Sequence, residues 1–215
     1  MRHTDKISPA KEGIKMGFSF GHVENVPMTY QGKYIIHLTD ATTGEVLDHR
    51  EKSNIVTLDG GILVAILLAS GLTPTPPSQR GLTMLAVGTG ATGPLLNPDA
   101  PDPRQRRLNS ELFRKAFASP TPQFRSSTGA AVSYPTNVVD FTTTFGASEA
   151  VGPLNEMGLL RVINPAVPTP VPAVFPAYDP TVDLSTRDIL ANYTTFSILS
   201  KPANSILSIT WRITT

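Results

Sequence analysis

The chain has 215 residues and a formal net charge of +1, from 18 Lys and Arg against 17 Asp and Glu. Such a balance lacks the strong positive field that nucleic acid attracts. The absence of cysteine excludes disulfides, thiolate metal sites and cysteine nucleophiles. Hydrophobic residues make up 40% of the chain, which is enough for a core. The 20 prolines disfavour long helices and favour loops and edge strands.

No membrane segment is expected. The residues after Met1 lack the apolar run of a signal peptide. The longest apolar run, residues 62–69, is far shorter than the roughly 20 residues that span a bilayer. We therefore expect a soluble protein made in a cytoplasm.

Residues 1–30 are polar and show no sustained hydrophobic period. We interpret them as an extended N-terminal arm that orders against a partner subunit, with a loosely ordered terminus as the alternative. Residues 31–215 are expected to form one β-sandwich domain.

The first pattern of that domain is a hairpin. Residues 32–40 predict a strand whose buried face carries Tyr34, Ile36 and Leu38. Residues 41–44 are a turn in which Gly44 can adopt a positive φ. Residues 45–52 are rich in charge, which suits an exposed edge strand.

The apolar run at residues 62–69 predicts a helix that is buried on all sides. Asp59 is placed as its N-cap and Gly71 as its C′ residue. A buried strand is the competing interpretation, because Ile and Val are present, and the caps favour the helix.

Further strands are predicted at residues 82–87, 130–145 and 155–162. Residues 109–117 fit either a short helix or an irregular strand. The proline-rich segments 73–80 and 164–183 are expected to be long loops, with the second able to hold a polyproline II conformation. Such loops are more often functional or ordered by a partner than idle.

The chain closes on the clearest strand, residues 205–215, where one face carries Leu207, Ile209, Trp211 and Ile213. Residues 192–200 and the turn 201–204 are expected to complete a hairpin with it. Seven to nine short strands with at most two helices indicate a sandwich or a barrel. We favour a mainly β fold, an antiparallel β-sandwich with one short buried helix, long proline-rich loops and the N-terminal arm.

Residues 88–93 form a G-x-G-x-x-G pattern after a strand. A dinucleotide site requires a helix next, because the helix N-terminus holds the pyrophosphate. Pro94 and Pro98 follow instead, so a glycine turn at the end of the strand is the favoured interpretation.

Of the four histidines, His37 and His49 are expected to be neighbours across the first hairpin. Solvated strand histidines are favoured over metal ligands for such a pair. His3 and His22 lie at no metal-ligand spacing.

The densest basic patch comprises Arg104, Arg106, Arg107, Arg114 and Lys115. Acidic residues interleave with it, so a solvated face or salt bridges between subunits are favoured over nucleic acid. The chain has no G-x-S-x-G motif, and no carboxylate pair stands out. No catalytic, cofactor-binding or metal-binding residue is therefore assigned, and no cofactor is expected.

The order of several short motifs resembles that of a family of tailed-bacteriophage virion proteins, described as structural, tail, baseplate or fibre-associated. The likeness covers about residues 32–215 and rests on the segments NIVT at 54–57, LAVGTG at 85–90, SELFRK at 110–115, NEMGLL at 155–160, FSILSK at 196–201 and LSITWRIT at 207–214. It implies a non-enzymatic virion component, assembled in a host cytoplasm, and it carries over no catalytic residue.

Three functions follow as hypotheses. The first is a homo-oligomeric structural protein that joins other virion proteins of the tail, baseplate or neck through its arm and loops, without nucleic acid or membrane. The second is a capsid decoration or cement protein. The third is a glycan-binding receptor-recognition module, with Tyr134, Phe175 and Tyr178 as candidate contacts.

Overall fold

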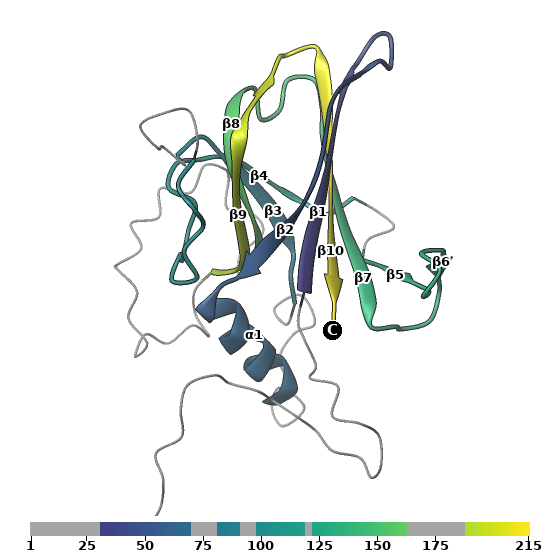
Figure 1. Ribbon diagram of the computed structural model, residues 1–215, viewed down its shortest axis with the longest axis vertical. Coiled ribbons are helices and arrows are strands. Elements are labelled where there is room, and N and C mark those ends of the chain that lie inside the picture. Colours follow the sequence, from purple (N-terminus) through teal and green to yellow (C-terminus); the bar gives the residue numbers. More distant parts are fainter. Residues whose placement is uncertain (1–30, 70–80, 91–97, 119–121, 163–187) are drawn as a thin grey trace, which may run out of the picture.

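The computed structural model describes residues 31–69, 81–90, 98–118, 122–162 and 188–215 (Figure 1). These residues form a mainly β structure with one helix. The expected arm at 1–30 and the proline-rich segments 73–80 and 164–183 lie outside the described residues.

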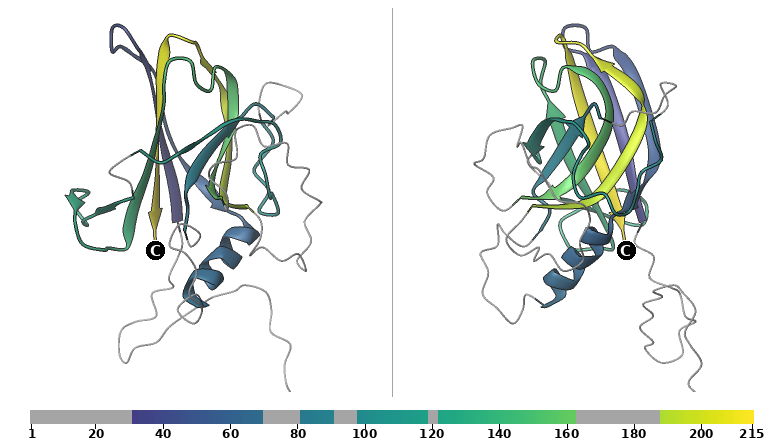
Figure 2. Two further views of the ribbon diagram at one scale, coloured as in Figure 1. Left: turned by 180° about the vertical axis from the view of Figure 1, so that it is seen from behind. Right: turned by 90° about the vertical axis from the view of Figure 1, so that its left-hand side faces the viewer.

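Ten strands form a single curled sheet in the order β4-β3-β8-β9-β2-β1-β10-β7-β5-β6 (Figures 1 and 2). Every strand pairing in it is antiparallel. The elements are β1 (Gln31–Asp40), β2 (Val46–Val56), α1 (Leu58–Ala69), β3 (Met84–Gly88), β4 (Glu111–Ala116), β5 (Gln123–Arg125), β6 (Ala131–Val132), β7 (Val138–Phe145), β8 (Gly152–Arg161), β9 (Ile189–Lys201) and β10 (Ser205–Thr214).

The curl encloses one main apolar core, to which strands from both halves of the sheet contribute. Trp211 of β10 lies at its centre with no exposed surface. Its ring centroid is 6.1 Å from that of Tyr34, its ladder partner on β1. The predicted apolar face of the closing strand is confirmed, because Leu207, Ile209, Trp211 and Ile213 are all buried.

The strand β2 connects the two halves of the sheet. It pairs with β1 along most of its length, whereas its ladder to β9 comprises only Ile55 and Val56 among the described residues. The charged segment 46–52 is therefore an exposed edge, as predicted. Arg50 connects this part of β2 to β9, where no ladder joins the two strands, because its guanidinium donates to the carbonyl oxygens of Ser197 and Ile198.

The predicted closing hairpin is wrong. β9 pairs with β8 and β2, whereas β10 pairs with β1 and β7, so the turn at 201–204 is an arch between the two halves of the sheet. The buried ammonium of Lys201 stabilises this arch by donating to the carbonyl oxygens of Ser205 at 2.8 Å and Gly146 at 2.9 Å.

The helix α1 is confirmed as a helix, but it is not buried on all sides. Only one face packs on the sheet, where Leu63 joins Ile189 and Ala191 of β9. Leu58 and Leu67 are 45% and 39% exposed. The helix lies at the foot of the curled sheet (Figure 1), where a single strand offers it a surface.

The N-cap of α1 is Thr57 rather than the predicted Asp59. The Thr57 hydroxyl accepts a hydrogen bond of 2.9 Å from the backbone N–H of Gly60. Asp59 is the second residue of the helix, in its first turn, where its carboxylate is buried. The predicted C′ residue, Gly71, lies outside the described residues.

The remaining strands follow the sequence patterns in part. The predictions for 82–87 and 155–162 are confirmed as β3 and β8, and segment 109–117 adopts the strand alternative as β4. Segment 130–145 is two strands rather than one, β6 and β7, which are separated around Pro135. The short strand β5 (Gln123–Arg125) is not among the predicted strands, because the sequence around it is polar and shows no apolar alternation.

Candidate functional site

The densest buried polar network of the described residues centres on the Glu156 side chain of β8, which has no exposed surface. Its Oε1 accepts hydrogen bonds from the backbone N–H groups of Gly90 at 3.0 Å and Ser110 at 2.8 Å. Its Oε2 accepts from the N–H of Asn109 at 2.9 Å and from the Tyr193 hydroxyl at 2.7 Å. The buried carboxylate thus fastens two loops and strand β9 to β8.

This network accounts for the first two glycines of the pattern, Gly88 at the end of β3 and Gly90, whereas Gly93 lies outside the described residues. A Cβ atom on Gly90 would lie 2.3 Å from the Ser110 nitrogen, and one on Gly88 would lie 2.5 Å from the Ser110 carbonyl oxygen. The N–H groups of such a turn are a binding surface for anions. Here Glu156 of the same chain supplies the anion, which supports the favoured interpretation of a structural turn.

A small polar cavity of about 180 Å³ lies beside the network. Tyr193 lines it and links it to Glu156, together with Asp99, Ala100, Asp102, Gln105, Asn109 and Thr195. Burial, reinforced by the nearby charge of Glu156, raises the pKa of the Tyr193 hydroxyl. The phenol therefore stays protonated and acts as a hydrogen-bond donor.

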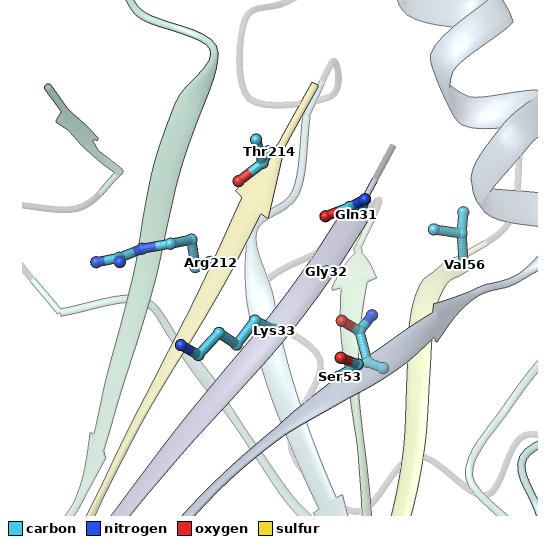
Figure 3. A pocket seen from close by; sticks show the side chains of 8 residues that line it. Gln31, Gly32, Lys33, Ser53, Val56, Arg212 and Thr214 are labelled. Atoms are coloured by element: carbon cyan, nitrogen blue, oxygen red, sulfur yellow. The ribbon is translucent and has the colours of Figure 1, made fainter. Parts of the chain in front are cut away.

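A second, larger cavity of about 320 Å³ opens at the start of β1 and the ends of β2 and β10 (Figure 3). Most of its lining residues have polar side chains; they are Gln31, Gly32, Lys33, Ser53, Asn54, Val56, Arg212 and Thr214. The Asn54 amide lies against Gly32, where an added Cβ would be 1.9 Å from Asn54 Oδ1.

The two cations of this cavity are each paired with a carboxylate outside its lining. Lys33 forms an ion pair with Glu51, and Arg212 Nε lies 2.8 Å from Asp140 Oδ1. Figure 3 shows both side chains extending to the same side of the strands. The cavity therefore presents hydroxyl and amide groups with little uncompensated charge.

Asp140 of β7 is buried between two guanidinium groups. Arg125 Nε donates to it at 2.7 Å, and Arg212 donates from Nε at 2.8 Å and from Nη2 at 3.0 Å. Burial on its own raises the pKa of the carboxyl, but the hydrogen bonds and charges of the two arginines outweigh it, so the pKa is lowered. Asp140 is therefore ionised near neutral pH and holds β5, β7 and β10 together.

The histidine pair is confirmed as a cross-strand pair. His37 and His49 are ladder partners, their Nδ1 atoms are 3.2 Å apart and their ring centroids are 4.3 Å apart. Both residues are exposed. Within the described residues, no group of three or more His, Cys, Asp and Glu side chains has a geometry suited to a metal ion.

The structure divides the basic patch. Arg104 and Arg107 are exposed, whereas Arg106 is buried against the carboxylate of Asp59, with Nε 3.0 Å from Oδ2. Burial raises the pKa of the Asp59 carboxyl, and Arg106 opposes that rise. This pair fixes the 98–110 loop to the start of α1, together with a bond from the Leu58 N–H to the Pro103 carbonyl oxygen.

The other cations of the patch are also paired within the chain. Arg114 Nη2 donates to Glu111 at 2.7 Å and Nη1 donates to Asp188 at 2.9 Å. Lys115 Nζ is 2.5 Å from Glu149 Oε2. Arg106, Arg114 and Lys115 thus have ion-pair partners within the chain, and salt bridges between subunits stay a prediction.

Of the candidate glycan contacts, Tyr134 is 59% exposed, whereas Phe175 and Tyr178 lie outside the described residues. No helix in the described part of the chain has the length and apolar character needed to cross a membrane. No protein family, curated protein or solved structure matches this chain.

Proposed function

We propose that this chain is a non-enzymatic structural protein of a tailed-bacteriophage virion. It assembles as a homo-oligomer on the tail, baseplate or neck, and residues 1–30 and the proline-rich loops contact neighbouring virion proteins. The two halves of the curled sheet act as a sandwich that presents these contacts. The resemblance of the motif order over residues 32–215 is the starting point of the proposal.

The observation that carries the proposal is exposed apolar side chains at two separate places, on α1 at the foot of the sheet and near the turn of the first hairpin at the opposite end (Figure 1). Leu58 at the start of the helix is 45% exposed, and Val46 and Leu47 near the hairpin turn are 57% and 47% exposed. An apolar helix with one face on a sheet and another in solvent is typical of a surface that a neighbouring subunit covers.

The buried charged groups support a structural role as well. Glu156 and Asp140 each direct both carboxylate oxygens to donors of the same chain. Such satisfied networks hold strands and loops in place, because a buried carboxylate is costly without its partners.

Mass spectrometry and cryo-microscopy of purified phage particles test the proposal. We expect the polypeptide in the particle, in multiple symmetric copies at the tail, baseplate or neck. A particle without this polypeptide contradicts the proposal. A position on the capsid surface supports the decoration alternative instead.

The contact surface is tested separately in solution. We expect Leu58→Glu to shift the purified chain toward a smaller mass in light scattering. The exposed charged residue Lys52, changed to Gln, serves as the control. An unchanged mass for Leu58→Glu would show that this face of α1 is not an oligomer contact.

A glycan-binding module is a second candidate, favoured by the exposed ring of Tyr134 and by the polar lining of the two cavities. A glycan array with the purified chain tests it. A hit that Tyr134→Ala abolishes would support it, and an array without hits would count against it.

A further inference from the structure

The first hairpin presents two imidazoles side by side on an exposed part of the sheet. His37 and His49 face each other across β1 and β2, with their Nδ1 atoms 3.2 Å apart. One Nδ1 must donate and the other accept in this contact, so a neutral pair uses a single proton between the two nitrogens.

The backbone fixes the separation of the two rings. The residue pairs on either side, Ile36 with Arg50 and Leu38 with Asp48, keep the same register, and a β-bulge follows between Leu38 and Thr39. β1 is also paired with β10 on its other side, where Ser208 is the partner of His37. The ladder therefore places the two histidines directly opposite each other, with β1 held on both sides.

This distance matches that of two nitrogen ligands on one metal ion. Zn²⁺ binds imidazole nitrogen at about 2.0–2.1 Å, so two such ligands in a tetrahedral arrangement lie about 3.3 Å apart. We propose that His37 and His49 bind a divalent transition-metal ion of the zinc, copper or nickel type through their two Nδ1 atoms. The ion takes the place of the shared proton, and water fills its remaining positions.

One carboxylate lies on the same face of the hairpin as the histidine pair. Glu51 lies two residues after His49 and on the same face of β2, where its carboxylate pairs with Lys33. The guanidinium of Arg50 is bound to Asp48, with Nη2 to Oδ2 at 2.7 Å, and to the carbonyl oxygen of Ser197 on β9. Arg50 directly follows His49 in β2, so its side chain lies on the opposite face of the strand from the histidine pair.

The site is tested with Zn²⁺ alone, on the full chain. The chain has four histidines and no cysteine, so a background with His3→Gln and His22→Gln leaves only the proposed pair of imidazoles. We expect isothermal titration of this background to give one Zn²⁺ per chain. The imidazole nitrogen resonances of both His37 and His49 are expected to shift together in NMR spectra.

Adding His37→Gln or His49→Gln to the background is expected to weaken Zn²⁺ binding at least tenfold. Glu45→Gln, an exposed carboxyl at the turn of the same hairpin, is the matched control and is expected to leave the affinity within twofold. Circular dichroism verifies that each variant is folded. Because both histidines are exposed, we expect no change in the thermal midpoint.

Two results would overturn the proposal. The first is that the chain with His3→Gln and His22→Gln does not bind Zn²⁺, or binds it with an affinity that neither His37→Gln nor His49→Gln weakens. The second is one Zn²⁺ per two chains together with a doubled mass in light scattering, since the pair would then supply ligands to a site between chains. Neither result bears on the proposed virion role, which mass spectrometry of the particle tests independently.

Discussion

Tyr193 and Glu156 are joined by a hydrogen bond of 2.7 Å in which a buried phenol donates to a buried carboxylate. Their strands, β9 and β8, are neighbours in the sheet. The same carboxylate also accepts the N–H groups of Gly90, Asn109 and Ser110. One side chain therefore connects two loops and two strands that are far apart in the sequence.

Removing the Tyr193 hydroxyl tests how much this hydrogen bond contributes to stability. We expect Tyr193→Phe to lower the free energy of unfolding by about 1.5–3 kcal/mol, the range for a hydrogen bond to a charged group. Glu156→Gln is expected to lower the free energy of unfolding by more than Tyr193→Phe. The amide NH₂ that replaces one carboxylate oxygen cannot accept the hydrogen bonds that this oxygen received. Urea denaturation measures both variants. Tyr134→Phe, at an exposed ring, is the control, and a Tyr193→Phe variant as stable as the wild type would contradict the account.

The glycine turn gives a second prediction. A Cβ atom at Gly90 would overlap the backbone of Ser110, whereas one at Gly81 meets no atom within 4 Å. We expect Gly90→Ala to lower the free energy of unfolding by about 1–3 kcal/mol through overpacking, and Gly81→Ala to leave it nearly unchanged. Equal stability of the two variants in chemical denaturation would show that the close approach of the loops is unimportant.

Local patterns predicted local structure. The alternation of Leu207, Ile209, Trp211 and Ile213 indicated β10 and its buried face, because the parity of a strand is set by its own sequence. The contact between His37 and His49 also followed, since a short turn fixes the register of a hairpin. Segment 109–117 was ambiguous because Arg114 and Lys115 interrupt its apolar residues.

Long-range pairing did not follow from the sequence. The short turn after Lys201 suits a hairpin, but β10 pairs with β1, where Trp211 lies opposite Tyr34. Both arrangements satisfy the same alternation, and the packing of the two rings is a tertiary property. The Glu156 network could not be predicted either, because its donors come from three separate segments of the chain. The spacing of Gly88 and Gly90 was the sequence feature related to it.

The start of α1 shows how two residues that both commonly cap helices can differ in role. Thr57 and Asp59 are both common N-cap residues, but only the Thr57 hydroxyl reaches the N–H of Gly60. Asp59 instead pairs with Arg106, which is 47 positions away. The sequence offers no sign that Arg106 is this partner, which is why the sequence pattern predicted Asp59 as the N-cap.

Removing the cap is therefore expected to weaken the start of α1. Thr57→Ala should lower the free energy of unfolding by about 0.5–2 kcal/mol, since the Gly60 N–H then loses its acceptor and the Leu190 carbonyl oxygen loses the hydroxyl donor. Thr57→Ser keeps the hydroxyl and is expected to retain most of the stability. Thermal unfolding followed by circular dichroism compares the two. A Thr57→Ser variant as unstable as Thr57→Ala would show that the methyl group matters, and not the cap.

The arginine-bound Asp140 predicts a loss of stability in acid. Its pKa in the folded chain lies below the value of about 3.9 in an unfolded chain, so the ionised form contributes stability above that value. This contribution is lost as the pH falls through the folded pKa. We therefore expect the free energy of unfolding to fall less steeply between about pH 4 and pH 2 in Asp140→Asn than in the wild type.

Urea denaturation over that pH range measures the effect. Asp140→Asn should be clearly less stable than the wild type at pH 7, and the difference should narrow in acid. Glu45→Gln removes an exposed carboxyl from the first hairpin and is the control, with a pH profile parallel to that of the wild type. A constant difference between Asp140→Asn and the wild type would show that ionisation of Asp140 does not stabilise the fold.

The last prediction concerns Trp211, on which the two halves of the sheet converge. Its ring has no exposed surface and packs beside Tyr34, whose ring in turn lies 6.3 Å from that of Phe196 on β9. Trp211→Ala therefore opens a cavity shared by β1, β9 and β10. It is expected to lower the free energy of unfolding by about 3–5 kcal/mol.

Ile206→Ala, at a half-buried position on the opposite face of β10, is expected to cost much less than Trp211→Ala. Trp211→Phe should fall between them, because it keeps an aromatic ring in the core but leaves part of the indole volume empty. Chemical denaturation ranks the three variants. If Trp211→Ala were as stable as Ile206→Ala, the core enclosed by the curled sheet would not depend on its central aromatic residue. The curl would then have to be maintained by the arch at 201–204 and by the Arg50 contacts to β9 instead.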